Sequence, residues 1–393
     1  GALAHRDDFD RAVGPAMGYT VTGDVVNTAH RLATAASPGQ VLVGDRTHRT
    51  TAEVVGYRLV GDLELKGKAD LVRAWVAGTT ADGPHHRGPE GRVLPLVGRD
   101  RELGELRTRL AGALDQRRVE VVTLVGEAGV GKTRLGMELA VLLAAPPLSA
   151  RVLWVSCPSY GPGADLAPLA DLVRAGLGIG TSAAPWAQED RLVEEVRAVA
   201  QTTGSDPAVL RRRLGLLLGL GGPSTRPVEP DPASPWAGIT DQQLGATRAV
   251  LDHVSSIRPT LVVIDDLHWA GPGVLRFLAG LPDRLAGRPL AVLALGRDEL
   301  LERRTSLVDA GPGRTTRSLD PLGDAASAEL VDRLLAEHDD ARIGPAALHR
   351  LVTSAGGSPL LLEQLVRYLV ESGGLAVVED RWMWTDEREG NEA

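Results

Sequence analysis

One stretch of sequence decides the fold of this chain: Gly126-Glu127-Ala128-Gly129-Val130-Gly131-Lys132-Thr133. It fits the pattern G-x-x-x-x-G-K-[ST], the P-loop, whose backbone N–H groups cradle phosphates. An apolar, β-branched run at 119–125 precedes it, and a helical pattern at 134–143 follows it. Lys132 is one of only three lysines among 43 lysines and arginines, and a compact ammonium suits this position better than a planar guanidinium. The context predicts a bound nucleoside triphosphate rather than a glycine-rich turn with a surface lysine.

Four apolar runs around this loop predict a parallel sheet. They lie at 119–125, 151–156, 260–265 and 290–296, and helical stretches separate them. Continuous apolar strands of this kind are covered by helices on both faces. Further helical patterns lie in a long insert at 186–201 and 207–218, and towards the end of the chain at 323–337, 345–354 and 358–371. The expected architecture is an α/β P-loop NTPase sheet with a helical lid.

Two adjacent acids end the third apolar run. A carboxylate at a strand tip beside a P-loop holds Mg²⁺, directly or through water, and we assign this role to Asp265. Asp266 would point to the other side of the strand, because successive side chains alternate, and would there polarise an attacking water. For His268, packing, hydrogen bonding and phosphate sensing all stay open. Arg297 follows the run at 290–296, where it is either a γ-phosphate contact or a surface arginine.

Further motifs give the chain a specific resemblance. Besides the P-loop, they are Leu96–Leu103, Asp265–Ala270, Gly296-Arg297, Ser318–Leu322 and Gly357–Glu363. Over about 94–372 they resemble the STAND class of signalling ATPases, within the AAA+ superfamily. The resemblance implies a switch in which ADP holds a closed lid, and ATP with a stimulus opens it for assembly. It also implies that Ser318–Leu322 forms the last sheet strand and its turn into the lid.

The same resemblance implies roles for individual residues. It assigns Lys132 and Thr133 to phosphate and Mg²⁺, and Asp265 to the metal. It assigns Asp266 to water activation and Arg297 to phosphate sensing. The nucleotide-binding set expected from it is Gly126, Glu127, Ala128, Gly129, Val130, Gly131, Lys132, Thr133 and Arg134, with Val97, Gly98 and Arg99 at the adenine pocket and Pro359 touching the base from the lid.

A second resemblance lies nearer the start of the chain. Asn27 and Arg31 stand one helical turn apart, where an amide can hold a ribose oxygen and a guanidinium can neutralise phosphoryl charge. By periodicity alone this is an unremarkable helix. The order G-D-x-V-N-x-A-x-R-L, S-P-G-Q-V-L-V and L-K-G-K, over about 15–77, resembles the C-terminal half of a class III nucleotide cyclase.

The cyclase resemblance implies that Asn27 and Arg31 stabilise a transition state, that Lys66 contacts the triphosphate and that Thr20 reads adenine. The two metal-binding aspartates and the base-reading lysine of that family are absent. Without metal carboxylates an in-line displacement has no two-metal clamp, so we expect no cyclic nucleotide from this chain.

The overall composition excludes several classes of protein and of binding site. The formal charge of −8 argues against a general nucleic-acid or membrane-surface binder. One cysteine, Cys157, allows no internal disulfide and no cysteine-based metal cluster. No apolar run reaches the roughly 18 residues of a membrane span, and no signal peptide opens the chain, so we expect a cytoplasmic protein. We also expect a fragment of a longer protein, because the first residue is Gly and the chain starts mid-pattern.

The expected organisation follows from these patterns. A partial α+β cyclase domain at 1–80 precedes a linker at 81–93, a P-loop NTPase domain at 94–322, a helical lid at 323–380 and a tail at 381–393. The main hypothesis is an ATP-binding and ATP-hydrolysing signalling switch, with ATP/ADP and Mg²⁺ as cofactors, from a protein that also carries an adenylate cyclase domain.

Alternative functions stay open from the sequence. They are a non-hydrolysing, nucleotide-gated regulatory or scaffold module, a transcription regulator that lacks its DNA-binding part here and, less well suited, a small-molecule P-loop kinase. Expected partners are ATP and further copies of the chain, as a cyclase-type dimer and an ATP-dependent oligomer. No membrane and no direct nucleic-acid partner is expected.

Overall fold

The structure of the protein is a computed structural model. The residues that this structure describes are 3–4, 20–21, 24–36, 41–52, 55–63, 71–80, 96–159, 166–180, 184–220, 241–303, 307–309, 311–336, 338, 341–378 and 381–385. The predicted linker at 81–93 lies outside the described residues. The chain divides into two compact units, Gly1–Pro95 and Leu96–Ala393.

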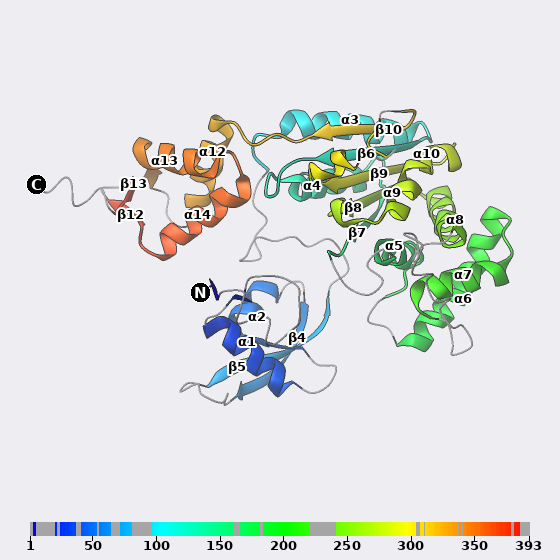
Figure 1. The fold of residues 1–393 in the computed structure, drawn as a ribbon, viewed down its shortest axis with the longest axis horizontal. Coiled ribbons are helices and arrows are strands. Elements are labelled where there is room, and N and C mark those ends of the chain that lie inside the picture. Colours follow the sequence, from blue (N-terminus) through cyan, green and yellow to red (C-terminus); the bar gives the residue numbers. More distant parts are fainter. Residues whose placement is uncertain are drawn as a thin grey trace, which may run out of the picture. The chain divides into compact units, whose positions relative to one another are not determined.

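The second unit is built on a five-stranded parallel sheet (Figure 1). Its strands are β6 (Val119–Val125), β7 (Arg151–Ser156), β8 (Thr260–Asp265), β9 (Leu290–Gly296) and β10 (Arg314–Ser318), in the order β10-β6-β9-β8-β7. Every residue of β6, β8 and β9 is buried, as continuous apolar runs require of a sheet covered on both faces. The predicted α/β fold with a parallel sheet is confirmed.

Side chains of successive strand residues divide between two apolar layers. Val121 and Val125 of β6 pack into one cluster, and Val122 and Leu124 pack into the other. Helices α3 (Asp100–Asp115) and α4 (Lys132–Ala144) cover the face of Val122 and Leu124. The other face is covered by α5 (Ala167–Leu177), α8 (Asp241–Ile257), α9 (Pro272–Ala279) and α10 (Leu281–Arg284). The sheet is therefore the middle layer of three.

The long insert contributes two further helices, α6 (Pro185–Thr203) and α7 (Pro207–Leu218), which pack on α8. Asp206 caps α7, because its side chain accepts hydrogen bonds from the backbone N–H groups of Ala208 (2.8 Å) and Val209 (3.0 Å). Pro207 follows at the first helical position, where its missing N–H costs nothing.

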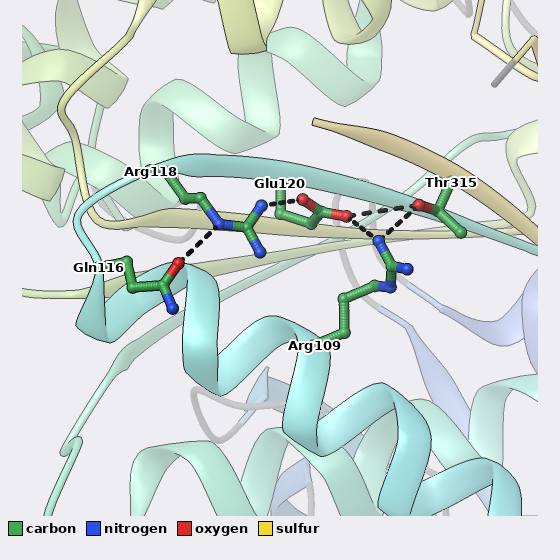
Figure 2. Close-up of polar contacts among 5 residues, drawn as sticks. All are labelled: Arg109, Gln116, Arg118, Glu120 and Thr315. Atoms are coloured by element: carbon green, nitrogen blue, oxygen red, sulfur yellow. Dashed lines mark hydrogen bonds and ion pairs between the residues drawn. The ribbon is translucent and has the colours of Figure 1, made fainter. Parts of the chain in front are cut away.

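A buried glutamate ties α3 to the edge of the sheet (Figure 2). Glu120 of β6 is 1% exposed, and its carboxylate accepts a 2.7 Å hydrogen bond from Arg109 of α3. Arg118 pairs with the other carboxylate oxygen. Arg109 also donates to Thr315 of the edge strand β10 over 2.8 Å. We call these four residues the Glu120 cluster; it satisfies a charge that burial alone would make costly.

The C-terminal part of the second unit holds helices and a small sheet. The helices are α12 (Asp324–Leu335), α13 (Pro345–Ala355) and α14 (Pro359–Glu371), drawn in orange to red in Figure 1. Strands β11 (Arg342–Ile343), β12 (Leu375–Val378) and β13 (Arg381–Trp384) form a sheet in the order β11-β13-β12. The expected tail at 381–393 thus begins with a strand instead, because β13 pairs with β12 and buries Trp382.

The first unit combines helices with antiparallel strands. Its elements are β1 (Leu3–Ala4), β2 (Thr20–Val21), α1 (Asp24–Ala35), β3 (Leu42–Gly44), α2 (Asp45–Thr51), β4 (Val55–Leu63) and β5 (Val72–Thr80). The larger sheet has the order β3-β5-β4, and Leu32 of α1 packs against Ala74 of β5. The ring of His48 stacks on Trp75, with 4.2 Å between centroids.

Across the described residues, no helix combines the length and the apolar character that a membrane span needs.

Candidate functional site

The P-loop joins β6 to α4 at the carboxyl edge of the sheet. Gly129 (φ 79°) and Gly131 (φ 101°) both take left-handed backbone angles, which side-chain-bearing residues rarely adopt. The loop closes around the Lys132 ammonium, whose Nζ donates to the carbonyls of Gly126 and Glu127, each over 2.8 Å. Burial lowers the pKa of Lys132; Arg297 lowers it further, and Asp298 opposes the shift.

Thr133 and Asp265 meet across the sheet edge. Thr133 follows Lys132 at the start of α4, and Asp265 is the last residue of β8. The Thr133 hydroxyl donates to Asp265 Oδ2 over 2.9 Å, and the backbone N–H of Asp266 donates to Asp265 Oδ1 over 2.9 Å. Asp265 is 6% exposed. Two hard oxygen donors therefore stand together beside the P-loop, as a Mg²⁺ site requires.

Asp266 lies in a different environment from Asp265. Its side chain is 54% exposed, and its backbone is left-handed at φ 54° and ψ 36°. It opens a short 3-10 turn, η2 (Leu267–Trp269). The two acids do separate, but not by the strand alternation that we expected, because β8 ends at Asp265. The backbone turn at Asp266 sets its direction instead.

Arg297 follows β9, and β9 lies between the P-loop strand β6 and the acid strand β8. Its charge lowers the pKa values of both Lys132 and His268, which places Arg297 within the same electrostatic neighbourhood. Asp298, which the sequence analysis did not single out, acts on Lys132 in the opposite direction. Its position two residues beyond the end of β9 is the only signal for it in the sequence.

Cys157 also lies beside the acids. It directly follows β7, and its backbone N–H donates to the Asp265 carbonyl over 2.9 Å. Burial raises the pKa of the Cys157 thiol to about 12, and the charges of Asp266 and Asp265 add to this shift. A thiol with such a pKa is protonated near neutral pH and is a poor nucleophile.

The expected adenine-pocket residues lie between the P-loop and the last helices. Arg99 is 5% exposed, and its Nη2 donates to the carbonyls of Val130 (3.1 Å) and Asp320 (2.7 Å). One guanidinium thus joins the P-loop to the segment that leads from β10 into α12. Val97 is buried, and a Cβ at Gly98 would come within 2.4 Å of Ala326 on α12. No motif in the sequence predicts the contact of Arg99 with two carbonyls.

The first turn of α14 lies directly on the P-loop. The backbone N–H of Leu360 donates to the Gly129 carbonyl over 3.3 Å. A Cβ at Gly131 would stand 3.9 Å from Pro359 Cγ, and one at Gly129 would stand 2.9 Å from Ser358 Oγ. Pro359, for which the resemblance implies a contact with the base, is therefore close to the P-loop.

The other expected site residues belong to α4 or to the first unit. Arg134 pairs with Glu138 over 2.9 Å, one turn further along α4. Arg31 lies on α1 in the first unit and is half-buried. Asn27 and Thr20 belong to α1 and β2, but their side chains lie outside the described residues, as does the whole of Lys66.

Comparison with known protein families agrees with this geometry. A family model for the AAA ATPase domain matches residues 95–293, just over half of the chain. The chain belongs to the AAA ATPase domain family. The matched residues run from the segment before Arg99 to β9, so the P-loop, the adjacent acids and the helical insert all lie within the AAA ATPase domain.

Several solved structures are similar to part of this chain. A mutant of RuvB from Thermotoga maritima shares 15% identity over 70% of this chain and 64% of that chain, with a TM-score of 0.36. The Drosophila ORC bound to DNA shares 14% identity over 71% and 58%, with a TM-score of 0.40. The Aeropyrum pernix ORC1 protein in complex with DNA shares 14% over 76% and 65%, with a TM-score of 0.41. The chain thus spans less than two thirds of each of these proteins.

No curated protein matches the chain. The comparisons give no support to the expectation that this chain has no nucleic-acid partner, which stays a prediction.

Proposed function

We propose that this chain binds ATP with Mg²⁺, hydrolyses it and uses the cycle as a signalling switch of the STAND type. The observation that carries the proposal is the junction of Lys132, Thr133 and Asp265. An ammonium is enclosed by the P-loop, and a hydroxyl and a carboxylate 2.9 Å apart stand beside it. This is the set of groups that a triphosphate and its metal require.

In this proposal each group has one task. Lys132 and the P-loop N–H groups hold the phosphates, and Thr133 and Asp265 are the residues that would hold Mg²⁺. When bound, the metal neutralises charge that develops on the phosphates during transfer. Asp266, with its half-exposed carboxylate, orients the attacking water. Arg297 contacts the γ-phosphate from the end of β9.

The contact between α14 and the P-loop supports the switching part of the proposal. In this arrangement the lid comprises α12 to α14, and its Leu360 N–H is bonded to Gly129 of the loop. Val97, Gly98, Arg99 and Pro359 would surround the adenine, and ADP would hold the lid closed. ATP would displace the lid and expose surfaces through which copies of the chain associate.

We also propose that the first unit derives from a class III cyclase and works here as a folded module without cyclase activity. The missing metal carboxylates are the reason, since Asn27 and Arg31 alone cannot organise the two-metal displacement. Purified chain with Mg²⁺ or Mn²⁺ and ATP should give no cyclic AMP above background. Production that is lost in Arg31→Ala would contradict this.

The decisive experiment for the main function is steady-state ATP turnover by the purified chain and by Lys132→Ala. The neutral side chain leaves phosphate charge uncompensated, so the variant should lose turnover and most nucleotide affinity. Arg107→Ala, which removes an exposed cation from α3, is the matched control and should behave like the unaltered chain. Tight nucleotide binding with no turnover would instead establish the non-hydrolysing regulatory module.

A further inference from the structure

The imidazole of His268 is buried without hydrogen-bond partners. Its side chain is 8% exposed, and among the described residues neither Nδ1 nor Nε2 has a hydrogen-bond partner. A buried polar atom left unpaired destabilises the fold, so most such atoms in native proteins are paired. An apolar side chain would fill the same place without this cost. Packing alone therefore does not explain a histidine at this position.

The surroundings of the ring identify its partner. His268 Nδ1 lies 4.0 Å from Asp266 Oδ1, too far for a hydrogen bond but only about 1 Å beyond one. Burial lowers the pKa of His268, followed by the charge of Arg297, while Asp266 and Glu299 oppose the shift. The ring is thus neutral near pH 7, with one nitrogen as donor and the other as acceptor.

The backbone that carries the ring is held in place, whereas the Asp266 side chain is more exposed. The backbone of η2 is fixed by hydrogen bonds from Trp269 N–H to the Asp266 carbonyl and from Ala270 N–H to the Leu267 carbonyl, each 2.9 Å long. The His268 carbonyl accepts a 3.1 Å hydrogen bond from Arg303. The Asp266 side chain, by contrast, is 54% exposed.

We propose that His268 is a positioning residue for ATP hydrolysis: its Nδ1–H donates a hydrogen bond to Asp266 and fixes the carboxylate that orients the attacking water. The inference rests on the proposed function, because it presumes that Asp266 acts on water. It adds a second requirement to that function, namely a carboxylate with one defined orientation. A misplacement of about 1 Å at such a group can cost up to about a hundredfold in rate.

Three substitutions distinguish this role from packing. In His268→Asn the amide nitrogen can occupy the place of Nδ1, in His268→Gln it can reach only the place of Nε2, and His268→Leu offers no donor. We expect His268→Leu and His268→Gln to hydrolyse ATP roughly tenfold to a hundredfold more slowly in single-turnover assays, with nucleotide affinity unchanged. His268→Asn should stay within about threefold of the unaltered rate. His349→Leu, at an exposed histidine of α13, is the matched control.

A double variant tests whether the effect passes through Asp266. If it does, His268→Leu combined with Asp266→Asn should be no slower than Asp266→Asn alone, because the orienting bond is already lost. A multiplicative loss of rate would overturn the proposal. So would a His268→Leu variant that hydrolyses ATP at the unaltered rate.

A spectroscopic measurement separates this inference from the proposed function. Nitrogen NMR of the His268 imidazole, with Mg²⁺ and a non-hydrolysable ATP analogue, should show the Nδ1–H tautomer, and Asp266→Ala should abolish the Nδ1 hydrogen bond. If the unaltered chain does not turn over ATP, the proposed function fails, and the spectrum alone decides the pairing. An Nε2–H tautomer would refute the pairing of His268 with Asp266. A spectrum that Asp266→Ala leaves unchanged would also refute it.

Discussion

At the scale of single residues, the candidate site contains two neighbouring acids in different surroundings. Asp265 is 6% exposed and bonded to Thr133, whereas the Asp266 side chain is 54% exposed on a left-handed residue. A buried carboxylate bonded to a hydroxyl suits a metal, and an accessible one suits a water. In the proposed function, two carboxylates one residue apart therefore have different tasks.

Substituting each acid by its amide should separate these tasks. Asp266→Asn keeps size and hydrogen bonding but loses basicity, so it should bind ATP almost normally and hydrolyse it roughly tenfold or more slowly. Asp265→Asn should instead weaken Mg²⁺-dependent nucleotide binding itself. Nucleotide titration and single-turnover hydrolysis of both variants measure the two effects. Equal, small effects on hydrolysis would mean that neither acid acts on the reaction.

The Glu120 cluster gives a second residue-scale prediction. Glu120→Gln keeps the shape of the side chain but removes the charge that faces Arg109 and Arg118. Since hydrogen bonds to charged groups contribute about 1.5–3 kcal/mol, the free energy of unfolding should fall by about that amount. Urea unfolding of the variant measures it, with Glu105→Gln, an exposed site on α3, as the control. An unchanged midpoint would show that the cluster adds no net stability.

At the scale of elements, the sequence predicts the buried strands, because their apolar runs are visible in it. It does not predict the strands that form only by pairing with a neighbouring strand. The strands β6, β7, β8 and β9 begin and end where the apolar runs do. In contrast β10, with the sequence Arg-Thr-Thr-Arg-Ser, is a polar edge strand without an apolar run, and we expected its strand a few residues later, at Ser318–Leu322. Strands β12 and β13 are short and hold together by pairing with each other, which no local pattern reports.

The candidate site likewise has some residues that local motifs predict and others that they do not. The P-loop and Asp265 follow from their motifs, because strand, loop and helix fix where those side chains lie. The two-carbonyl contact of Arg99 could not be predicted, because it joins residues that are 221 positions apart in the sequence. The direction of Asp266 was inferred from strand alternation, but a left-handed residue ends that alternation.

The packing of α6 on α8 contains a buried histidine and should make stability depend on pH. His253 Nδ1 lies 2.7 Å from the Thr202 hydroxyl, and burial lowers the pKa of His253 below its ordinary value of 6.5, against opposing effects of Glu195 and Asp252. The unfolded chain therefore takes up this proton first. The stabilisation is present above about pH 6.5 and is lost as the pH falls through the lower, folded-state pKa.

His253→Asn, which does not titrate, should show a smaller fall in melting temperature than the unaltered chain between pH 7 and about pH 5. His349→Asn is the exposed control and should follow the unaltered chain. Parallel curves for all three proteins would show that His253 does not contribute.

At the scale of the whole molecule, the two units should respond differently to nucleotide. Only the second unit contains the P-loop and its acids, so a ligand at about 100 times its dissociation constant should stabilise that unit by roughly 2.7 kcal/mol. Calorimetry with Mg-ADP should shift one transition and leave any separate transition of the first unit in place. Lys132→Ala should remove the shift. A shift of equal size in that variant would show that the nucleotide binds elsewhere.

The contacts of Arg99 affect how fast the segments that it joins can separate. Its guanidinium donates to the Val130 carbonyl and to the Asp320 carbonyl, so these two segments cannot part without breaking one of the bonds. Such a bond contributes about 1.5–3 kcal/mol, which in a rate corresponds to a factor of about ten to a hundred or more. A lid that moves about the connection at Asp320 would thus open more slowly. The lifetime of each nucleotide state would then depend in part on a single side chain.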